Sequence, residues 1–212
     1  MCNIKKILTS IINIIPFINR YHTRNAVYSC KKMLLHCKID SKGTNNVIIL
    51  HEGGSMQHCL LHIRGNDNRI EIGSNTSASN VEFWIEDDCN SIVVGDNTSL
   101  CGKAHLACIE GTTIEIGNDC LFSSDIVFRT GDSHSLLDNN GKRINPSKSI
   151  KIGNHVWIGH RVLVNKGSVI SDNTIVGTGT IVTKQFYRKN VVIAGVPGNV
   201  IKDEVTWDKR RL

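Results

Sequence analysis

The chain has 212 residues, 40% of them hydrophobic, which predicts a single domain with a substantial core. Its formal net charge of +6 is uneven: residues 1–45 carry +7, residues 46–141 carry −10 and residues 142–212 carry +9. The basic residues are scattered and lack an aromatic platform, so we do not expect nucleic acid as a partner. The basic last third suits a ligand that carries phosphates.

The cysteines and histidines do not form a recognisable metal or disulfide framework. The eight cysteines show no CxxC spacing and no good secretory cleavage site precedes them, which predicts reduced thiols in a cytoplasmic protein. His51, His58, Cys59 and His62 suggest zinc, but their spacing matches no common structural zinc pattern. We therefore expect no metal.

Residues 1–45 precede the repeats and are predicted to form an N-terminal helical cap. Aliphatic residues recur at helical spacing at positions 4, 7, 8, 11, 12 and 15, and Pro16 would end or kink that helix. The run is too short and too polar to span a bilayer. It would either cover the open end of the fold or make a peripheral contact with the inner membrane through residues 1–20.

A 22-residue repeat follows, marked by one polar residue per repeat: Asn46, Asn68, Asn90 and Thr112. An apolar, any, apolar pattern comes after each of the last three, at Ile70/Ile72, Ile92/Val94 and Ile114/Ile116, as in a strand whose alternate side chains point inward. The next such pair, Ile150/Ile152, comes 36 residues after Ile114/Ile116. One repeat therefore contains an insertion of loop length, at about residues 130–147.

Six consecutive hexads then run from Ile152 to Tyr187. Each begins with Ile or Val, at positions 152, 158, 164, 170, 176 and 182. This beat fits a triangular coil of about eighteen residues, in which each flat face contributes one branched side chain to the interior. A wider β-helix could also have the 22-residue period, but the hexads favour the triangular form. Residues 46–202 are predicted to form this solenoid and residues 203–212 a short C-terminal tail.

The hexads, the segment IGNHVWIG, the loop TGDSHSLLD and the closing IAGVPGNVIK together resemble the left-handed β-helix hexapeptide-repeat acyltransferases. The likeness covers residues 46–202 and is nearest to bacterial polysaccharide O-acetyltransferases. It implies an all-β, left-handed parallel β-helix and acetyl transfer from acetyl-CoA to a hydroxyl of a surface saccharide. It also implies a homotrimer whose active sites lie between subunits.

The resemblance also implies roles for particular residues. His134, in the inserted loop, matches the family's catalytic histidine, and a histidine pKa suits general-base work on a hydroxyl. Asp132 would orient the imidazole or bind the acceptor. Asp125 matches a position that contacts the acceptor sugar. Trp157 would face the cleft beside the acceptor and the pantetheine arm, or else pack between coils.

For acetyl-CoA, the expected contacts are spread over the last coils. In the segment Gly177, Thr178 and Gly179, the two glycines permit the pantetheine arm to approach the backbone closely. Basic side chains suit the phosphates, and the resemblance places a proline near the adenine. The residues concerned are Lys166, Lys184, Lys202 and Pro197.

Three alternatives stay open on sequence alone. A xenobiotic or antibiotic acetyltransferase would share the fold and the acetyl donor. A zinc-dependent β-helix carbonic anhydrase is the second alternative, since His155 and His160 are five residues apart, but the family pattern would need a histidine at Asn165. A non-catalytic scaffold would retain the hexads without needing a loop that carries His134.

Overall fold

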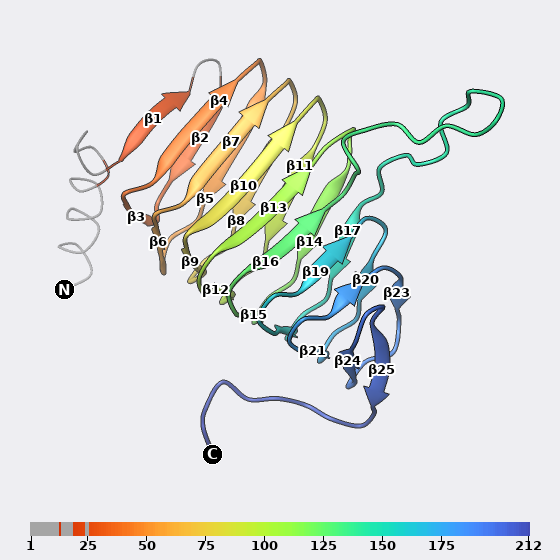
Figure 1. Cartoon of the computed structure of the whole chain (residues 1–212). Coiled ribbons are helices and arrows are strands. Elements are labelled where there is room, and N and C mark those ends of the chain that lie inside the picture. Colours follow the sequence, from red (N-terminus) through yellow and green to blue (C-terminus); the bar gives the residue numbers. More distant parts are fainter. Residues whose placement is uncertain (1–12, 14–18, 24–25) are drawn as a thin grey trace.

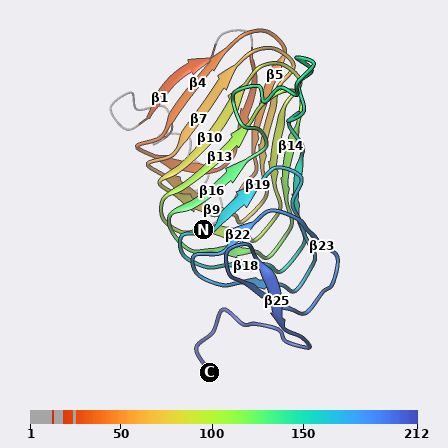
Figure 2. The same ribbon diagram turned by 45° about the vertical axis from the view of Figure 1, so that its right-hand side comes forward.

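The structure is a computed structural model that describes residues 13, 19–23 and 26–212. The described chain winds into a solenoid whose three flat faces are parallel sheets, as Figures 1 and 2 show. The predicted helix at residues 4–15 lies outside the described residues, except for Asn13, which is helical. No helix among the described residues is long and apolar enough to cross a membrane.

Each sheet receives one strand from each coil. Sheet 1 contains β1 (Arg20–Thr23), β4 (Lys38–Lys42), β7 (Leu60–Arg64), β10 (Val81–Glu86), β13 (Ala104–Cys108), β16 (Ile126–Arg129), β19 (Leu163–Asn165) and β22 (Ile181–Val182). Sheet 2 contains β2 (Ala26–Cys30), β5 (Asn46–Leu50), β8 (Arg69–Ile72), β11 (Ser91–Val94), β14 (Thr113–Ile116), β17 (Ile150–Ile152), β20 (Val169–Ile170) and β23 (Gln185–Phe186).

Sheet 3 has nine strands and closes the triangle. It contains β3 (Met33–Leu35), β6 (Ser55–Gln57), β9 (Ser77–Ser79), β12 (Ser99–Leu100), β15 (Leu121–Phe122), β18 (Trp157–Ile158), β21 (Ile175–Val176), β24 (Val192–Ala194) and β25 (Asn199–Lys202). The last pair, β24 and β25, is antiparallel, so the chain turns back on itself at the end of the solenoid.

The buried interior confirms the predicted six-residue period. The six leading residues, 152, 158, 164, 170, 176 and 182, are all at most 1% exposed, and successive ones fall on sheets 2, 3 and 1 in turn. Branched aliphatic side chains suit these short, fully buried strands. The 22-residue step also holds, because Ile48, Ile70, Ile92 and Ile114 stack in register.

The polar marker residues form a buried ladder between sheets 1 and 2. The side-chain oxygen of Asn46 accepts from the backbone N of Asn68 (3.0 Å), Asn68 from Asn90 (2.8 Å), and Asn90 from Thr112 (3.0 Å). Each amide thereby satisfies a backbone donor that the corner would otherwise bury unpaired. The hydroxyls of Thr112 and Thr130 are hydrogen-bonded to each other (2.7 Å), and the insertion begins there.

The solenoid begins earlier than the sequence predicts. Strands β1 to β4 lie within residues 20–42 and already supply all three sheets, so the repeat starts at Arg20 and not at Asn46. Their register steps are irregular: Arg20 pairs with Lys38, 18 residues on, and Ala26 with Asn46, 20 residues on. An uneven step leaves no period in the sequence, so the sequence pattern does not distinguish the first coil from the predicted cap.

Candidate functional site

The inserted segment leaves sheet 1 after β16 and rejoins the solenoid at β17. Ile114 pairs with Ile150, which confirms a coil of 36 residues where the three steps from Ile48 to Ile114 have 22 each. Figure 1 shows the segment extending well outside the solenoid. Its tip is a small antiparallel turn, in which Leu137 bridges Arg143 and the backbone N of Asp138 donates to the carbonyl of Lys142 (2.9 Å).

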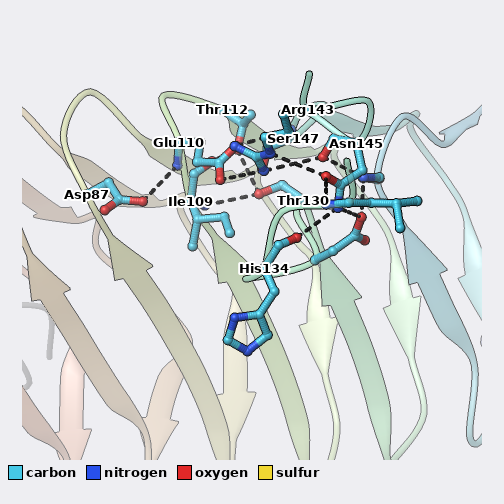
Figure 3. Close-up of polar contacts among 12 residues, drawn as sticks. Asp87, Ile109, Glu110, Thr112, Thr130, His134, Arg143, Asn145 and Ser147 are labelled. Atoms are coloured by element: carbon cyan, nitrogen blue, oxygen red, sulfur yellow. Dashed lines mark hydrogen bonds and ion pairs between the residues drawn. The ribbon is translucent and has the colours of Figure 1, made fainter. Parts of the chain in front are cut away.

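Asn145 holds the base of this loop together (Figure 3). Its Nδ2 donates to Asp132 Oδ2 (2.8 Å) and to the carbonyl oxygen of His134 (2.9 Å). Its Oδ1 accepts from the backbone N of Leu136 (2.7 Å) and from Arg143 Nε (3.3 Å). One amide therefore fixes both sides of the His134 backbone, a role that the sequence did not indicate.

Asp132 is occupied by partners other than His134. Its Oδ2 accepts from Lys166 Nζ at 2.5 Å as well as from Asn145. The hydrogen bond from Lys166 lowers the pKa of Asp132 below its ordinary value, and the hydrogen bond from Asn145 lowers it further. The carboxylate is therefore ionised at neutral pH. Among the described residues, no hydrogen bond joins Asp132 to the imidazole of His134.

Lys166, which is predicted to contact a CoA phosphate, makes its contacts within the chain in this structure. Its Nζ also donates to the carbonyl oxygen of Asn145 (3.1 Å), so the lysine ties the β19–β20 corner to the loop. A cation engaged by a carboxylate and a carbonyl in this way has a loop-holding role in the free chain. The structure therefore gives Lys166 and Asp132 a structural function that the sequence does not indicate.

His134 itself is exposed, and Figure 3 shows its ring directed away from the Asn145 cluster. The structure records no hydrogen bond to the imidazole within residues 26–212. The backbone of His134 is thus fixed while its ring is free to meet a group outside the chain. This arrangement suits a base that acts on a bound substrate.

A second group lies at the edge where sheet 3 passes into sheet 1. Asp125 follows β15 and has a left-handed φ of 57°. His160 follows β18, one coil further along, and its Nδ1 lies 2.9 Å from Ser124 Oγ, 3.0 Å from the Ser124 carbonyl oxygen and 3.8 Å from Asp125 Oδ2. Sequence reasoning had selected Asp125 but assigned no role to His160 at this edge.

The predicted glycines continue the same edge. The backbone N of Gly179 donates to the carbonyl oxygen of His160 (2.8 Å), so Asp125, His160 and Gly179 stand on consecutive coils. Gly179 has a φ of +72°, and a Cβ built there would meet nothing within 4 Å. The backbone at this point is accessible to a ligand, as close approach by a pantetheine arm would require.

Trp157 lies on sheet 3 and is 40% exposed, so it does not pack between coils. Trp207, from the C-terminal segment, flanks it with ring centroids 6.1 Å apart. Trp207 is only 8% exposed because it stacks on His155 at 4.3 Å and donates from Nε1 to the His155 carbonyl (2.9 Å). The segment predicted to be a tail is therefore folded back onto the solenoid.

Among the remaining predicted cofactor residues, Pro197 lies in the next coil at this edge, because Val176 pairs with Ile193 and the backbone N of Ile181 donates to the carbonyl oxygen of Gly195. The two lysines lie elsewhere. Lys184 lies in the corner after β22, where its Nζ donates to Asn199 Oδ1 (2.6 Å). Pro197 follows Val196 through a cis peptide bond between β24 and β25, and Lys202 is exposed in β25. These three residues belong to the closing hairpin and its neighbourhood.

The site residues thus form two groups on opposite edges of sheet 1. Asp125 precedes β16 and the loop follows it, so one strand of four residues, roughly 13 Å, separates the two edges. The insertion and the Asp125 edge lie at the same height along the solenoid, because both adjoin β16. Asp125, Trp157 and Gly177–Gly179 share one edge or its adjoining sheet, whereas Asp132, His134 and Lys166 share the other.

The histidines considered for zinc are dispersed. His51 contacts Glu71 (2.8 Å), His58 stacks on His36, and His62 stacks on Trp84. In residues 13, 19–23 and 26–212, no group of three histidine, cysteine or acidic side chains is placed to hold a metal ion. His155 lies under Trp207 and His160 lies at the other edge of sheet 3, so this pair does not converge on one site.

No protein-family model matches the sequence, and no curated protein matches it significantly. Two of the solved structures that are similar to this chain each cover 92% of it. The polySia-specific acetyltransferase NeuO is 27% identical, with a TM-score of 0.82, over 92% of this chain and 91% of its own. The polysialic acid O-acetyltransferase OatWY is 25% identical, with a TM-score of 0.61, over 92% of both chains.

These matches confirm the predicted left-handed β-helix fold and the resemblance to polysaccharide O-acetyltransferases. They also confirm the enzyme class: the chain is an acyltransferase.

Proposed function

We propose that this acyltransferase moves an acetyl group from acetyl-CoA to a hydroxyl of a bacterial surface saccharide, with an acidic polymer such as polysialic acid as the leading acceptor. The observation that carries the proposal is the placement of His134. It stands on the insertion that lengthens one coil to 36 residues after several coils of 22, in a chain that matches NeuO over 92% of its length. NeuO and OatWY are described as acetyltransferases of polysialic acid, which supports the acceptor class.

The active site is proposed to form between subunits of a homotrimer. Within one chain, His134 and the Asp125 edge lie on opposite sides of sheet 1. A loop that extends away from its own solenoid is suited to reach a neighbouring one at the same height. In the assembly, His134 of one subunit would then face Asp125 and Trp157 of the next, which is a heterologous contact that closes by three-fold rotation.

The chemistry follows from a general base beside an activated acyl group. His134 removes the proton of the acceptor hydroxyl, and the oxygen attacks the thioester carbonyl carbon to give a tetrahedral oxyanion. Backbone amides at the glycine-lined edge are suited to stabilise that oxyanion. As the intermediate collapses, the C–S bond breaks and the proton held by His134 passes to the departing thiolate, giving CoA and the acetyl ester.

The test is release of free thiol from acetyl-CoA in the presence of polysialic acid, neutral saccharides and a panel of aminoglycosides. H134A is expected to lower saccharide-dependent release by about 10²–10⁴-fold. H22A, which removes an exposed histidine of β1, is the matched control and should behave as wild type. Transfer to an antibiotic and to no saccharide would replace the acceptor class, and full activity of H134A would remove the assigned base.

The shared site has its own test. Mixed oligomers are prepared from H134A and W157A subunits, each inactive alone. If each site takes His134 from one subunit and Trp157 from another, mixing restores part of the activity because some sites receive both intact residues. Mixtures that stay as inactive as the parents, at proven subunit exchange, would place both residues of a site in the same chain.

A further inference from the structure

The geometry points to His160 as a residue that binds acceptor hydroxyls, paired with Asp125, an assignment that rests on the proposed saccharide acetylation. The starting observation is the environment of the Nδ1 atom. It lies 3.0 Å from the carbonyl oxygen of Ser124 and 2.9 Å from the hydroxyl oxygen of the same residue. A carbonyl oxygen only accepts hydrogen bonds, so Nδ1 must carry the proton.

The tautomer follows from this contact. With the proton held at Nδ1, the neutral ring has a lone pair at Nε2, and that atom is a hydrogen-bond acceptor. The structure records no partner for Nε2 within the described residues, and the His160 side chain is 38% exposed. The ring is therefore fixed on one side and open on the other, as for a side chain prepared to receive a ligand.

Asp125 places a carboxylate on the Nδ1 side of the same ring. Its Oδ2 lies 3.8 Å from His160 Nδ1, and its side chain is 45% exposed. The left-handed backbone of Asp125, with φ of 57°, sets the direction in which this carboxylate leaves the corner. The Asp125 carboxylate and the open Nε2 atom of His160 both accept hydrogen bonds, and sugar hydroxyls are donors that suit such acceptors. The same pair would repel a carboxylate.

The position along the solenoid connects this pair to the reaction. His160 occupies the coil between Asp125 and Gly179, and its carbonyl oxygen accepts from the Gly179 backbone N. A hydroxyl-bearing part of the acceptor held by His160 and Asp125 would lie beside the glycine-lined backbone proposed for the acyl donor. His160 is thus a specificity-determining residue that selects how the polyol surface of the sugar is presented.

Two substitutions separate binding from structure. Asparagine in H160N ends near the Nδ1 position, so it keeps a donor for the Ser124 carbonyl but has no atom at the Nε2 position. Glutamine in H160Q reaches the Nε2 position with its amide. We expect H160N to raise the KM for the saccharide about tenfold, the loss of one neutral hydrogen bond, and to leave the KM for acetyl-CoA unchanged. H160Q should stay within about threefold of wild type.

The outcomes are distinguishable from failure of the proposed function. A wild-type enzyme that acetylates no saccharide overturns the function and this assignment with it. If the wild type is active and H160N leaves the saccharide KM unchanged, only the role of His160 is overturned. The same holds if H160N and H160Q lose activity equally and both raise the KM for acetyl-CoA. If H160N fails to fold, titrating saccharide into wild type while following the His160 Nε2 nitrogen shift decides the question, since absence of a shift excludes contact.

Discussion

Asn145 offers the sharpest test of how the loop presents His134. N145A removes four side-chain hydrogen bonds, to the Asp132 carboxylate, the His134 carbonyl, the Leu136 backbone N and Arg143 Nε. Three of the four bonds are exposed and the one to Arg143 is half-buried, so each contributes at the low end of the usual range, about 0.5 kcal/mol, or about 2 kcal/mol together. That free energy corresponds to a roughly thirtyfold loss in the population of the held loop.

The expected result is therefore a fall in saccharide-dependent kcat/KM of about ten- to thirtyfold. The thermal midpoint of N145A should stay close to that of wild type, because the loop lies outside the buried core of the solenoid. Amide hydrogen exchange of residues 132–145 should accelerate by a comparable factor. N145D is the matched variant: it keeps an acceptor for Leu136 but loses both donated bonds and adds repulsion toward Asp132.

Two results would refute this reasoning. If N145A exchanges its loop amides as slowly as wild type, other contacts hold the loop and the four bonds are redundant. If exchange accelerates while kcat/KM stays unchanged, the order of the free loop does not limit catalysis, and binding of substrate or a neighbouring subunit supplies the order instead. A fall of many degrees in the thermal midpoint would show that the loop is coupled to the core.

Two further expectations concern stability. Burial lowers the pKa of Lys32 from 10.5 to about 8, so between these pH values the unfolded chain binds one proton that the folded chain does not. The free energy of unfolding therefore rises with pH in this range, by about 3 kcal/mol in full. K32M should abolish this rise in urea titrations from pH 8 to 10. Buried tyrosines and thiols with raised pKa values oppose the rise, so the comparison is the difference between wild type and K32M. W207A should lower the free energy of unfolding by about 3 kcal/mol and W207F by much less, and equal losses in both would contradict packing on His155 as the cause.

The regular part of the fold could be read from the sequence because its period reports the interior directly. Every coil must send a side chain of similar size into the same narrow space, so Ile152, Ile158 and Val164 recur at a fixed spacing. The Asn46 to Thr112 ladder was visible for the same reason, since each corner has the same backbone donor to satisfy. The repeat that contains His134 is 14 residues longer than this regular spacing, and the insertion could be recognised for that reason.

The misplaced boundary and the missed residues share a different cause. The first coil has uneven steps, so β1 to β4 left no period to detect. Asn145, His160 and Trp207 act through contacts with partners 11, 36 and 52 residues away, at His134, Ser124 and His155. No local spacing rule encodes such contacts.

By itself, the sequence determined the interior of this protein from Asn46 onward: which side chains point inward, how long each of those coils is and where one coil is interrupted. Each coil of a solenoid packs its inward side chains in the same surroundings, so similar residues recur at a regular spacing in the sequence. Only the tertiary structure decided the surface arrangement, in which Lys166 and Asn145 hold the loop while Asp125 and His160 stand on the far edge of sheet 1. The surface has no repeated constraint, so its geometry depends on which distant side chains the folded coils bring together.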